Sequence, residues 1–379
     1  MRTFGVEEEL LLVNARDYSP APAAPKLLSR APRAATGRQA TAEMQQEMIE
    51  VIIPPATDAA VLRADIQAAR SAMDEAARAS GARAVALATS PLPVHPHPTE
   101  KPRYRRMMRR YGITARNNLA CGLHVHVSID SPDEGVGVLD RIRVWLPTLI
   151  ALSANPPYAD GEDTGYASYR TMIWNQWPCA GPSPVFDTLE AYRDHERSLL
   201  STGVLMDEGM LYFDARLSRA HPTVEVRVAD VCARVETTVA LAAIVRALVE
   251  TAAIEWRNGQ PAPDVSVSEL RLDSWCAALS GLSDRLVHPV SRKAERASVV
   301  VRALLEHVRP ALVASGDESL VDAEIRDLLT RGTAADRLRS VLLRKGTLEA
   351  VVAQAIDWTH SSGRKSDEAT APACEDPVA

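Results

Sequence analysis

Strict alternation of apolar and polar side chains in the stretch ACGLHVHVSI, residues 120–129, constrains the fold more than any other feature of this sequence. In a β-strand, successive side chains point to opposite faces. The leucine, the valines and the isoleucine would therefore lie on one face, and His124 and His126 on the other. We expect a strand that buries one face in a core and offers two imidazoles to a site.

Two other segments repeat this pattern. The segment TVEVRVAD, which begins at Thr223, places Glu225 and Arg227 on its polar face. The start of the chain, FGVEEELLLV, places Glu7 and Glu9 on one face. If these strands share a sheet, their charged side chains form one polar floor, which we interpret as the active site.

Six strands are expected, all in the first 230 residues. Their approximate ranges are 2–13, 48–53, 83–88, 120–129, 210–217 and 223–230. The one-sided alternation favours a mainly antiparallel sheet with one solvated face and one face covered by helices. The expected fold class is therefore α+β.

The expected helices begin with one from Thr57 or Asp58 to about Ser80, ended by Gly81. Another covers 138–153, with a kink at Pro147 left open. A further helix is expected over 186–202. After residue 236 only helices are expected, at about 237–257, 266–280, 291–314, 320–331 and 333–357. We expect one catalytic domain, 1–360, with a sheet core (1–235) and a helical part (236–360), followed by a disordered tail, 361–379.

Three irregular segments carry separate expectations. Residues 18–37 should form a mobile loop, and residues 155–184, rich in Gly, Pro and Trp, a substrate lid. The basic run KPRYRRMMRR from Lys101 is either a solvated helix face or an anion-binding site beside the carboxylates.

Charge and cysteine content narrow the classes of protein. With 43 Lys+Arg and 49 Asp+Glu the net charge is −6, which argues against a nucleic-acid or anionic-membrane surface. No signal peptide is seen and no uninterrupted apolar run reaches about 18 residues, so a cytoplasmic protein is expected. The five cysteines show no CxxC pair and are expected to be reduced thiols.

Carboxylates with one or two histidines form an oxygen-dominated ligand set, which suits Mg²⁺ or Mn²⁺ better than a structural zinc. Neighbouring arginines fit the phosphates of a metal-bound nucleotide. The sequence has no Walker A loop and no GxGxxG motif, which excludes those two nucleotide sites. Taken singly, each charged pair is equally well a solvated strand face.

The motifs together resemble the carboxylate-amine ligases of the glutamate-cysteine ligase superfamily, and most closely the YbdK-type branch, glutamate-cysteine ligase 2. They occur in family order over about residues 1–235: GVEEEL, EMIEV, YRRMMRRYG, CGLHVHVS, DTGYASYR, FDARLS and TVEVRVAD. The resemblance implies a curved antiparallel sheet that forms a funnel, related to glutamine synthetase and guanidino kinases.

The resemblance also implies roles for individual residues. The implied magnesium ligands are Glu7, Glu9, Glu50, His124 and Glu225. Arg227 and Glu225 are the implied catalytic residues. Arg227 would contact the transferred phosphoryl group, and Arg216 would contact the nucleotide. Tyr104, Arg105 and Arg170 would hold the acidic substrate. The matching motifs also contain Glu43, Glu47, His126 and Asp214, whose roles stay open as second-shell or nucleotide contacts.

The reaction implied by the resemblance has two steps. ATP with Mg²⁺ phosphorylates a glutamate-like carboxylate, and an amine then attacks the acyl phosphate to give an amide, γ-glutamyl if the acid is glutamate. A small-molecule kinase of guanidino kinase type and a non-catalytic ligand-binding relative are the alternatives. The identities of acid and amine are open, and so is the oligomeric state, a homo-oligomer included.

Overall fold

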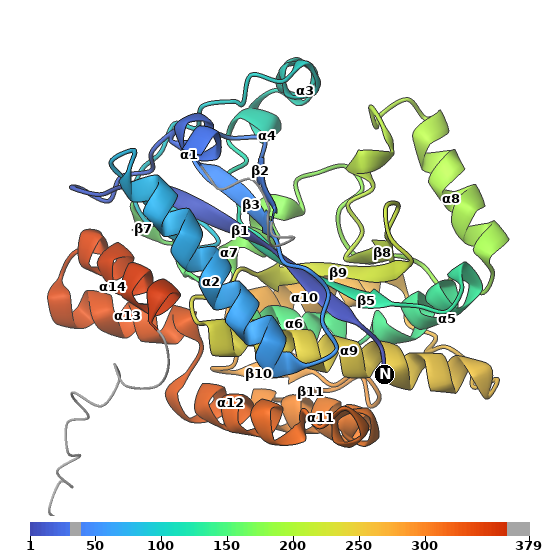
Figure 1. The fold of residues 1–379 in the computed structure, drawn as a ribbon. Helices are drawn as coiled ribbons and strands as arrows, with labels where there is room; N and C mark the ends of the chain where they lie inside the picture. Colours follow the sequence, from blue (N-terminus) through green and yellow to red (C-terminus); the bar gives the residue numbers. More distant parts are fainter. Residues whose placement is uncertain (31–38, 362–379) are drawn as a thin grey trace, which may run out of the picture.

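The computed structural model describes residues 1–30 and 39–361, and their centre is one seven-stranded sheet. Figure 1 shows this sheet among the helices. The strand order is β2-β3-β1-β5-β9-β8, with β4 paired to β1 as well, and every pair is antiparallel. The strands are β1 (Phe4–Asn14), β2 (Gln39–Ala42), β3 (Met48–Ile52), β4 (Ala82–Val85), β5 (Gly122–Ser128), β8 (Ala215–Leu217) and β9 (Thr223–Asp230). The expected α+β class and antiparallel sheet are confirmed.

All six expected strands are present, and β2 is a seventh that was not expected. The strand expected over 210–217 is reduced to β8, because Glu208–Met210 forms a 3-10 helix instead. The loop expected over 18–37 contains helix α1 (Ala24–Arg30), which buries Ala24 and Leu27, so that part of the prediction is wrong. Residues 31–37 of this loop lie outside the described residues.

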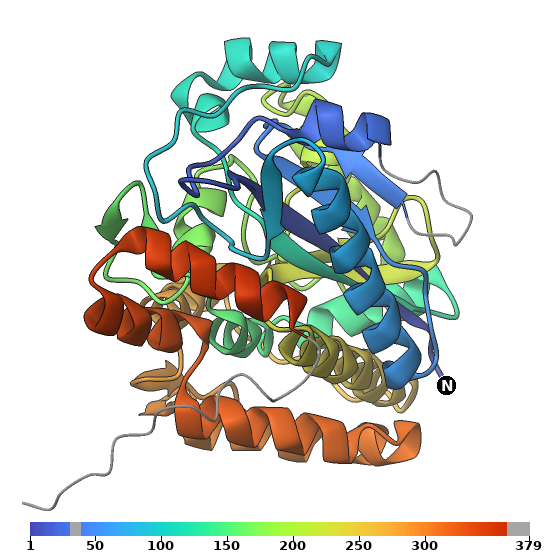
Figure 2. The ribbon, with the colours of Figure 1, turned by 60° about the vertical axis from the view of Figure 1, so that its left-hand side comes forward.

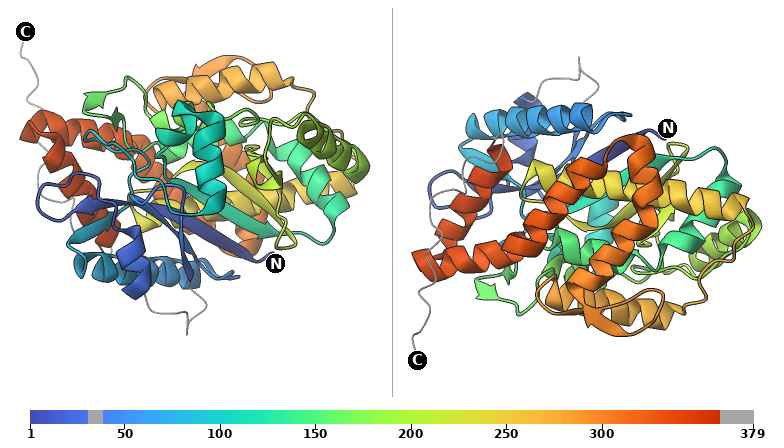
Figure 3. Two further views of the ribbon diagram at one scale, coloured as in Figure 1. Left: turned by 90° about the horizontal axis from the view of Figure 1, so that it is seen from above. Right: turned by 90° about the horizontal axis from the view of Figure 1, so that it is seen from below.

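Helices cover the apolar face of the sheet. The main ones are α2 (Ala59–Arg78), which contacts β4, α6 (Leu146–Ser153), which contacts β9, and α9 (Val235–Arg257), which contacts β1 and β5. Figure 2 shows α2 running across the sheet. Seen from below in Figure 3, the helices of the C-terminal part fill the view, whereas from above α3 (Pro102–Tyr111) lies over the strands. The polar face of the sheet is thus the one beneath α3.

The C-terminal part departs from the expectation of uninterrupted helices. Two helices, α13 (Ala334–Lys345) and α14 (Leu348–His360), form where one helix was expected over 333–357. Helix α13 ends because Gly346 takes a left-handed φ of 77°. A hairpin of β10 (Arg285–Val287) and β11 (Ala294–Arg296) lies where only helices were expected. The remaining helices there are α10 (Val267–Ser280), α11 (Ala297–Ser315) and α12 (Glu318–Arg331).

The helices expected over 138–153 and 186–202 are both present, the first of them in two parts. The helix expected over 138–153 is divided into α5 (Pro132–Ile142) and α6, whose first turn holds Pro147, where proline is tolerated. The expected helix near 186–202 is α8 (Leu189–Ser201). Residues 362–379 of the predicted tail lie outside the described residues.

Helix α9 is the one described helix that is long and apolar enough to cross a membrane. However, 83% of its most apolar window is buried inside the protein. It contacts β1, β5, α2, α5, α6, α11 and α12. We conclude that α9 is a core helix.

A buried ion pair connects the sheet to the helices on its apolar face. Glu8 and Arg70 are each 1% exposed, and the Arg70 guanidinium donates two hydrogen bonds to the Glu8 carboxylate, at 2.8 and 2.6 Å. Arg70 also donates to the carbonyl oxygens of Cys232 and Ala233, at 2.7 and 3.1 Å. The pair therefore joins β1, α2 and the segment between β9 and α9.

Removal of one partner should strongly destabilise the fold. Arg70→Met leaves the Glu8 carboxylate buried without its cation, at an expected loss of about 3–5 kcal/mol in the free energy of unfolding. The double variant Glu8→Gln/Arg70→Met should recover part of this loss, because no charge is then left unpaired. Urea unfolding of the three proteins measures both effects. A loss below about 1 kcal/mol for Arg70→Met would contradict the assigned role.

Candidate functional site

The register of the central strands brings the predicted site residues together on the polar face. Glu7 of β1 lies opposite His124 of β5, and Glu9 lies opposite Glu50 of β3. On the far side of β5, Glu225 of β9 lies opposite His126. Side chains directly opposite one another in antiparallel strands lie about 5 Å apart at Cβ. Segments far apart in sequence therefore form one cluster.

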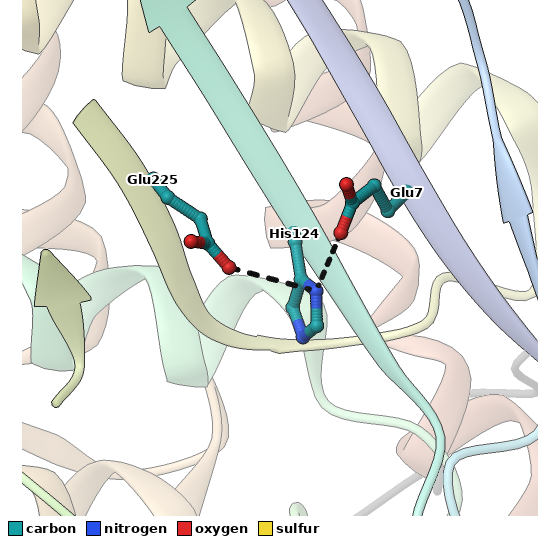
Figure 4. Close-up of side chains that lie close together, drawn as sticks. All are labelled: Glu7, His124 and Glu225. Atoms are coloured by element: carbon teal, nitrogen blue, oxygen red, sulfur yellow. Dashed lines mark hydrogen bonds and ion pairs between the residues drawn. The ribbon is translucent and has the colours of Figure 1, made fainter. Parts of the chain in front are cut away.

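The first group of possible metal ligands consists of Glu7, His124 and Glu225 (Figure 4). His124 Nδ1 lies 3.2 Å from Glu7 Oε2 and 4.0 Å from Glu225 Oε1. Burial alone would raise the pKa of Glu7, but hydrogen bonds with His124 and His126 hold it below its usual value. Burial lowers the pKa of His124, and the charge of Arg227 lowers it further, so the imidazole is favoured in its neutral, metal-binding form.

The second group consists of Glu9, Glu43 and Glu50, whose nearest oxygens all lie within 4.8 Å of one another. Burial, and then the neighbouring charges of Glu43, Glu7 and Glu9, raise the pKa of Glu50 to about 9. Burial, and then the charge of Glu9, raise the pKa of Glu43 to about 7. Thr41 Oγ1 donates to Glu50 at 3.1 Å. A cation bound among these three carboxylates would reduce their mutual repulsion.

The residues present fit divalent cations. Six ligand groups in two clusters supply the hard oxygen donors and the neutral imidazole that Mg²⁺ or Mn²⁺ accepts. Nε2 of His124 is buried and has no hydrogen-bond partner. Glu43 was left without a definite role by the sequence, and it lies with Glu9 and Glu50 in the second cluster.

Arg216 and Arg227 both pair with Glu225. Arg216 donates to both carboxylate oxygens, at 2.8 and 3.2 Å, and Arg227 Nη1 donates to Oε1. Burial favours the neutral acid, but the charges of Arg227 and Arg216 hold the pKa of Glu225 below its usual value. Both guanidinium groups line the same pocket as the carboxylates. They could share phosphate oxygens with a metal ion bound there.

A pocket of about 430 Å³ lies over the carboxylates. Its lining also includes methionine and aromatic residues that sequence reasoning did not assign: Met44, Met48, Met107, Trp174, Trp177 and Tyr212. Both tryptophans lie in the segment expected to be a lid. Trp174 is on α7 (Tyr169–Trp174). Arg103, which also lines the pocket, belongs to the basic run for which an anion-binding site beside the carboxylates was one of two expectations. Asn118, Arg219 and His221 line the pocket as well, and no expectation for them came from the sequence.

The three residues predicted to hold the acid lie in different environments. Tyr104 lines the pocket. Arg105 is exposed, pairs with Glu100 at 3.0 Å, and does not line it. Arg170 is 2% exposed and behind the pocket wall, where it donates to the Arg227 carbonyl at 3.2 Å and lies over the Trp174 ring. Direct contact of Arg105 and Arg170 with a substrate stays a prediction.

A β-bulge in β9 decides which side chains face the site. Leu123 pairs with Ala229 but Val125 pairs with Val226, so β9 holds one extra residue in this interval. The extra residue reverses the alternation. Arg227 and Asp230 consequently share a face, although they are three residues apart.

Asp230 anchors the first part of the segment 155–184, which contains Trp174 and Trp177, to β9. Its carboxylate accepts hydrogen bonds from the Asn155 backbone N–H at 2.9 Å and the Ser168 hydroxyl at 2.8 Å. Its own N–H donates to the Ser153 hydroxyl at 3.1 Å. Burial raises the pKa of Asp230 to about 7.

The other residues left open by the sequence also have places in the structure. Glu47 is 1% exposed and accepts from the backbone N–H and ring Nδ1 of His97, at 3.0 and 2.6 Å, which holds the proline-rich loop on the sheet. His126 lines the pocket and contacts Thr223 at 3.0 Å. Burial raises the pKa of Asp214 to about 7, and its carbonyl accepts from the Arg227 N–H at 2.8 Å.

Comparison with protein families gives one match over nearly the whole chain. Residues 3–354 match the model described as Glutamate-cysteine ligase family 2 (GCS2). A protein of Paenarthrobacter aurescens named "Putative glutamate--cysteine ligase 2-1" is 48% identical over 374 residues, 97% of each chain. A protein of Streptomyces coelicolor named "Putative glutamate--cysteine ligase 2" is 45% identical over 363 residues, 96% of this chain and 100% of that one.

Solved structures share the fold at low sequence identity. The glutamate-cysteine ligase of Francisella tularensis, in complex with AMP, has a TM-score of 0.65 at 14% identity, over 95% of this chain and 89% of that one. A bifunctional glutathione synthetase from Pasteurella multocida has a TM-score of 0.68 at 17% identity, over 94% of this chain and 52% of that one. At these identities the likeness shows the fold alone.

The raised pKa of Asp230 gives a pH-dependent stability. Because the folded protein holds a proton here up to about pH 7 and the unfolded chain releases it near pH 4, stability should fall as pH rises through this window. Asp230→Asn lacks this dependence. Relative to the natural protein, the variant should gain about 1–3 kcal/mol between pH 5 and pH 8. Chemical unfolding at both pH values measures the gain, and a constant difference would rule out the shift.

Proposed function

The chain belongs to glutamate-cysteine ligase family 2, and from this we propose that it is an ATP-dependent carboxylate-amine ligase with a glutamate-like acid as one substrate. The observation that supports this most is the pairing of two carboxylate clusters with two arginines in one pocket. Such a site binds a nucleotide's phosphates through cations and guanidinium groups together. We also infer that the reaction takes place in the cytoplasm, in a single catalytic domain over residues 1–360.

The first step joins the acid to phosphate. A carboxylate oxygen of the acid attacks the γ-phosphorus of ATP, the bond to the β-phosphate oxygen breaks, and ADP leaves. Arg227 and Arg216 lie at the clusters and would neutralise the transferred phosphoryl oxygens. Mg²⁺, held by Glu7, His124 and Glu225 and by Glu9, Glu43 and Glu50, would neutralise phosphate charge when bound.

The second step forms the amide. The lone pair of an uncharged amine attacks the acyl carbon, the carbon–oxygen bond to phosphate breaks, and phosphate leaves with the electron pair and takes up the proton from nitrogen. The protein aligns the reactants and keeps water from the acyl phosphate. The acid would be held through Tyr104 at the pocket, with Arg105 and Arg170 as the proposed cations.

Metal dependence is the first test. A chelator should abolish ATP turnover, and Mg²⁺ or Mn²⁺ should restore it. Mg²⁺ should also raise the thermal midpoint, because binding to the folded protein alone stabilises it, and Glu50→Gln should remove most of this rise. Glu75→Gln, at an exposed glutamate of α2, is the matched control. Full turnover in chelator, or rescue by zinc alone, would rule out the magnesium assignment.

Oxygen transfer separates the ligase from a kinase that stops at phosphorylation. With ¹⁸O in the acid's carboxylate, the acyl phosphate carries label in its bridging oxygen, and one labelled oxygen must leave with phosphate as the amide forms. Mass spectrometry of phosphate and amide measures this. Amide formed together with unlabelled phosphate would exclude the acyl phosphate.

A further inference from the structure

One part of the pocket wall consists of aromatic and methionine side chains. Trp174 and Tyr104 are partly exposed, and Trp177, Tyr212 and Met107, which also line the pocket, are at most 9% exposed. The ring centroids of Trp174 and Tyr212 are 4.8 Å apart, and those of Trp177 and Tyr212 are 5.6 Å apart. The wall is therefore preformed and largely aromatic, as in sites for flat apolar groups.

The wall lies next to the reacting end of the site. The guanidinium carbon of Arg227 is 5.7 Å from the Trp174 ring centroid, and Arg227 pairs with Glu225 of the first cluster. An attacking amine must come within about 3–3.5 Å of the acyl carbon, so its body lies beside this end. The adenine of ATP is separated from the γ-phosphate by the ribose and two phosphates. Position thus favours the amine over adenine as the group against Trp174.

The cations lining the pocket are already paired. Each of its four arginines has a carboxylate partner: Arg103 with Asp207, Arg216 and Arg227 with Glu225, and Arg219 with Glu208. Arg103, the arginine of α3 on the wall side, makes two hydrogen bonds of 2.8 Å to Asp207. Because Arg216 and Arg227 are assigned to the transferred phosphoryl group, a carboxylate on the amine substrate would meet only Arg103 and Arg219 among the described lining arginines, and each of these already pairs with a carboxylate. Burial of an unpaired carboxylate is costly.

We propose that the amine substrate is an arylalkylamine without a carboxylate, rather than an amino acid. This inference rests on the proposed ligase function and names the substrate class of the same site. The amine nitrogen would face the acyl phosphate, and the ring of the amine would face Trp174. The amine nitrogen forms the carbon–nitrogen bond, and the carbon–oxygen bond to phosphate breaks. Phosphate, which ATP has supplied, leaves with the electron pair of that bond and takes up the proton from nitrogen.

Matched amines test the proposal. Purified protein with ATP, Mg²⁺ and glutamate is assayed with 2-phenylethylamine, L-phenylalanine, ethylamine and L-cysteine, with amide mass and phosphate release as readouts. L-Phenylalanine differs from 2-phenylethylamine only by the carboxylate. We expect kcat/KM for 2-phenylethylamine to exceed the other three by about 10-fold or more. A preference for L-cysteine or L-phenylalanine would overturn the proposal.

A variant locates the effect. Trp174→Leu should lower the ratio of kcat/KM for 2-phenylethylamine to that for ethylamine by about 10-fold, whereas Trp275→Leu, at an exposed tryptophan of α10, should leave this ratio unchanged. A rise in KM for ATP in Trp174→Leu, with the amine ratio unchanged, would assign the wall to adenine and overturn the proposal.

Two measurements separate this inference from the proposed function. Hydroxylamine traps an acyl phosphate whatever the natural amine is. If hydroxamate forms from glutamate but the amine assay shows no preference for 2-phenylethylamine, the ligase function is supported and the inference on the amine is overturned. If no hydroxamate forms, the proposed function fails. Calorimetric titration with 2-phenylethylamine then decides the inference, since binding that is lost in Trp174→Leu supports it and no binding to the natural protein overturns it.

Discussion

The pleat of β1 divides three consecutive glutamates between two environments. Glu7 and Glu9 face the pocket, and Glu8 between them faces the apolar layer, where Arg70 neutralises it. A shift of the β1 register by one residue would bury two carboxylates without a cation and remove both from the site. The ion pair under the sheet therefore fixes the register that places the ligands above it.

The two carboxylate clusters differ in how their charge is balanced. Glu7 and Glu225 already have His124 and two arginines, and their pKa values are lowered. In the other cluster burial and mutual repulsion dominate, and the pKa values of Glu43 and Glu50 are raised. The second cluster thus has more to gain from a divalent cation, because the charges of Lys101 and Arg227 offset only part of the repulsion at Glu43.

Period-two alternation was sufficient to predict the central strands and their polar faces, because a side chain's face depends on local geometry alone. It could not predict the bulge in β9, which depends on pairing with β5 and brings Asp230 to the same face as Arg227. The sequence named Glu43 but left its role open, because Glu43 precedes β3 and reaches Glu9 and Glu50 only through the tertiary fold. The hairpin β10-β11 was missed since its three-residue strands are too short for a period.

Gly122 sets a limit on how this pocket can change. A Cβ at this position would lie 2.2 Å from Nη2 of Arg170, whose side chain is enclosed between β5, β9 and Trp174. Arg170 of helix α7 thereby packs tightly at Gly122 against the strand that carries His124. Redesign for other substrates would have to exchange individual side chains of the wall, because displacing α7 as a body would disturb the histidine strand with it.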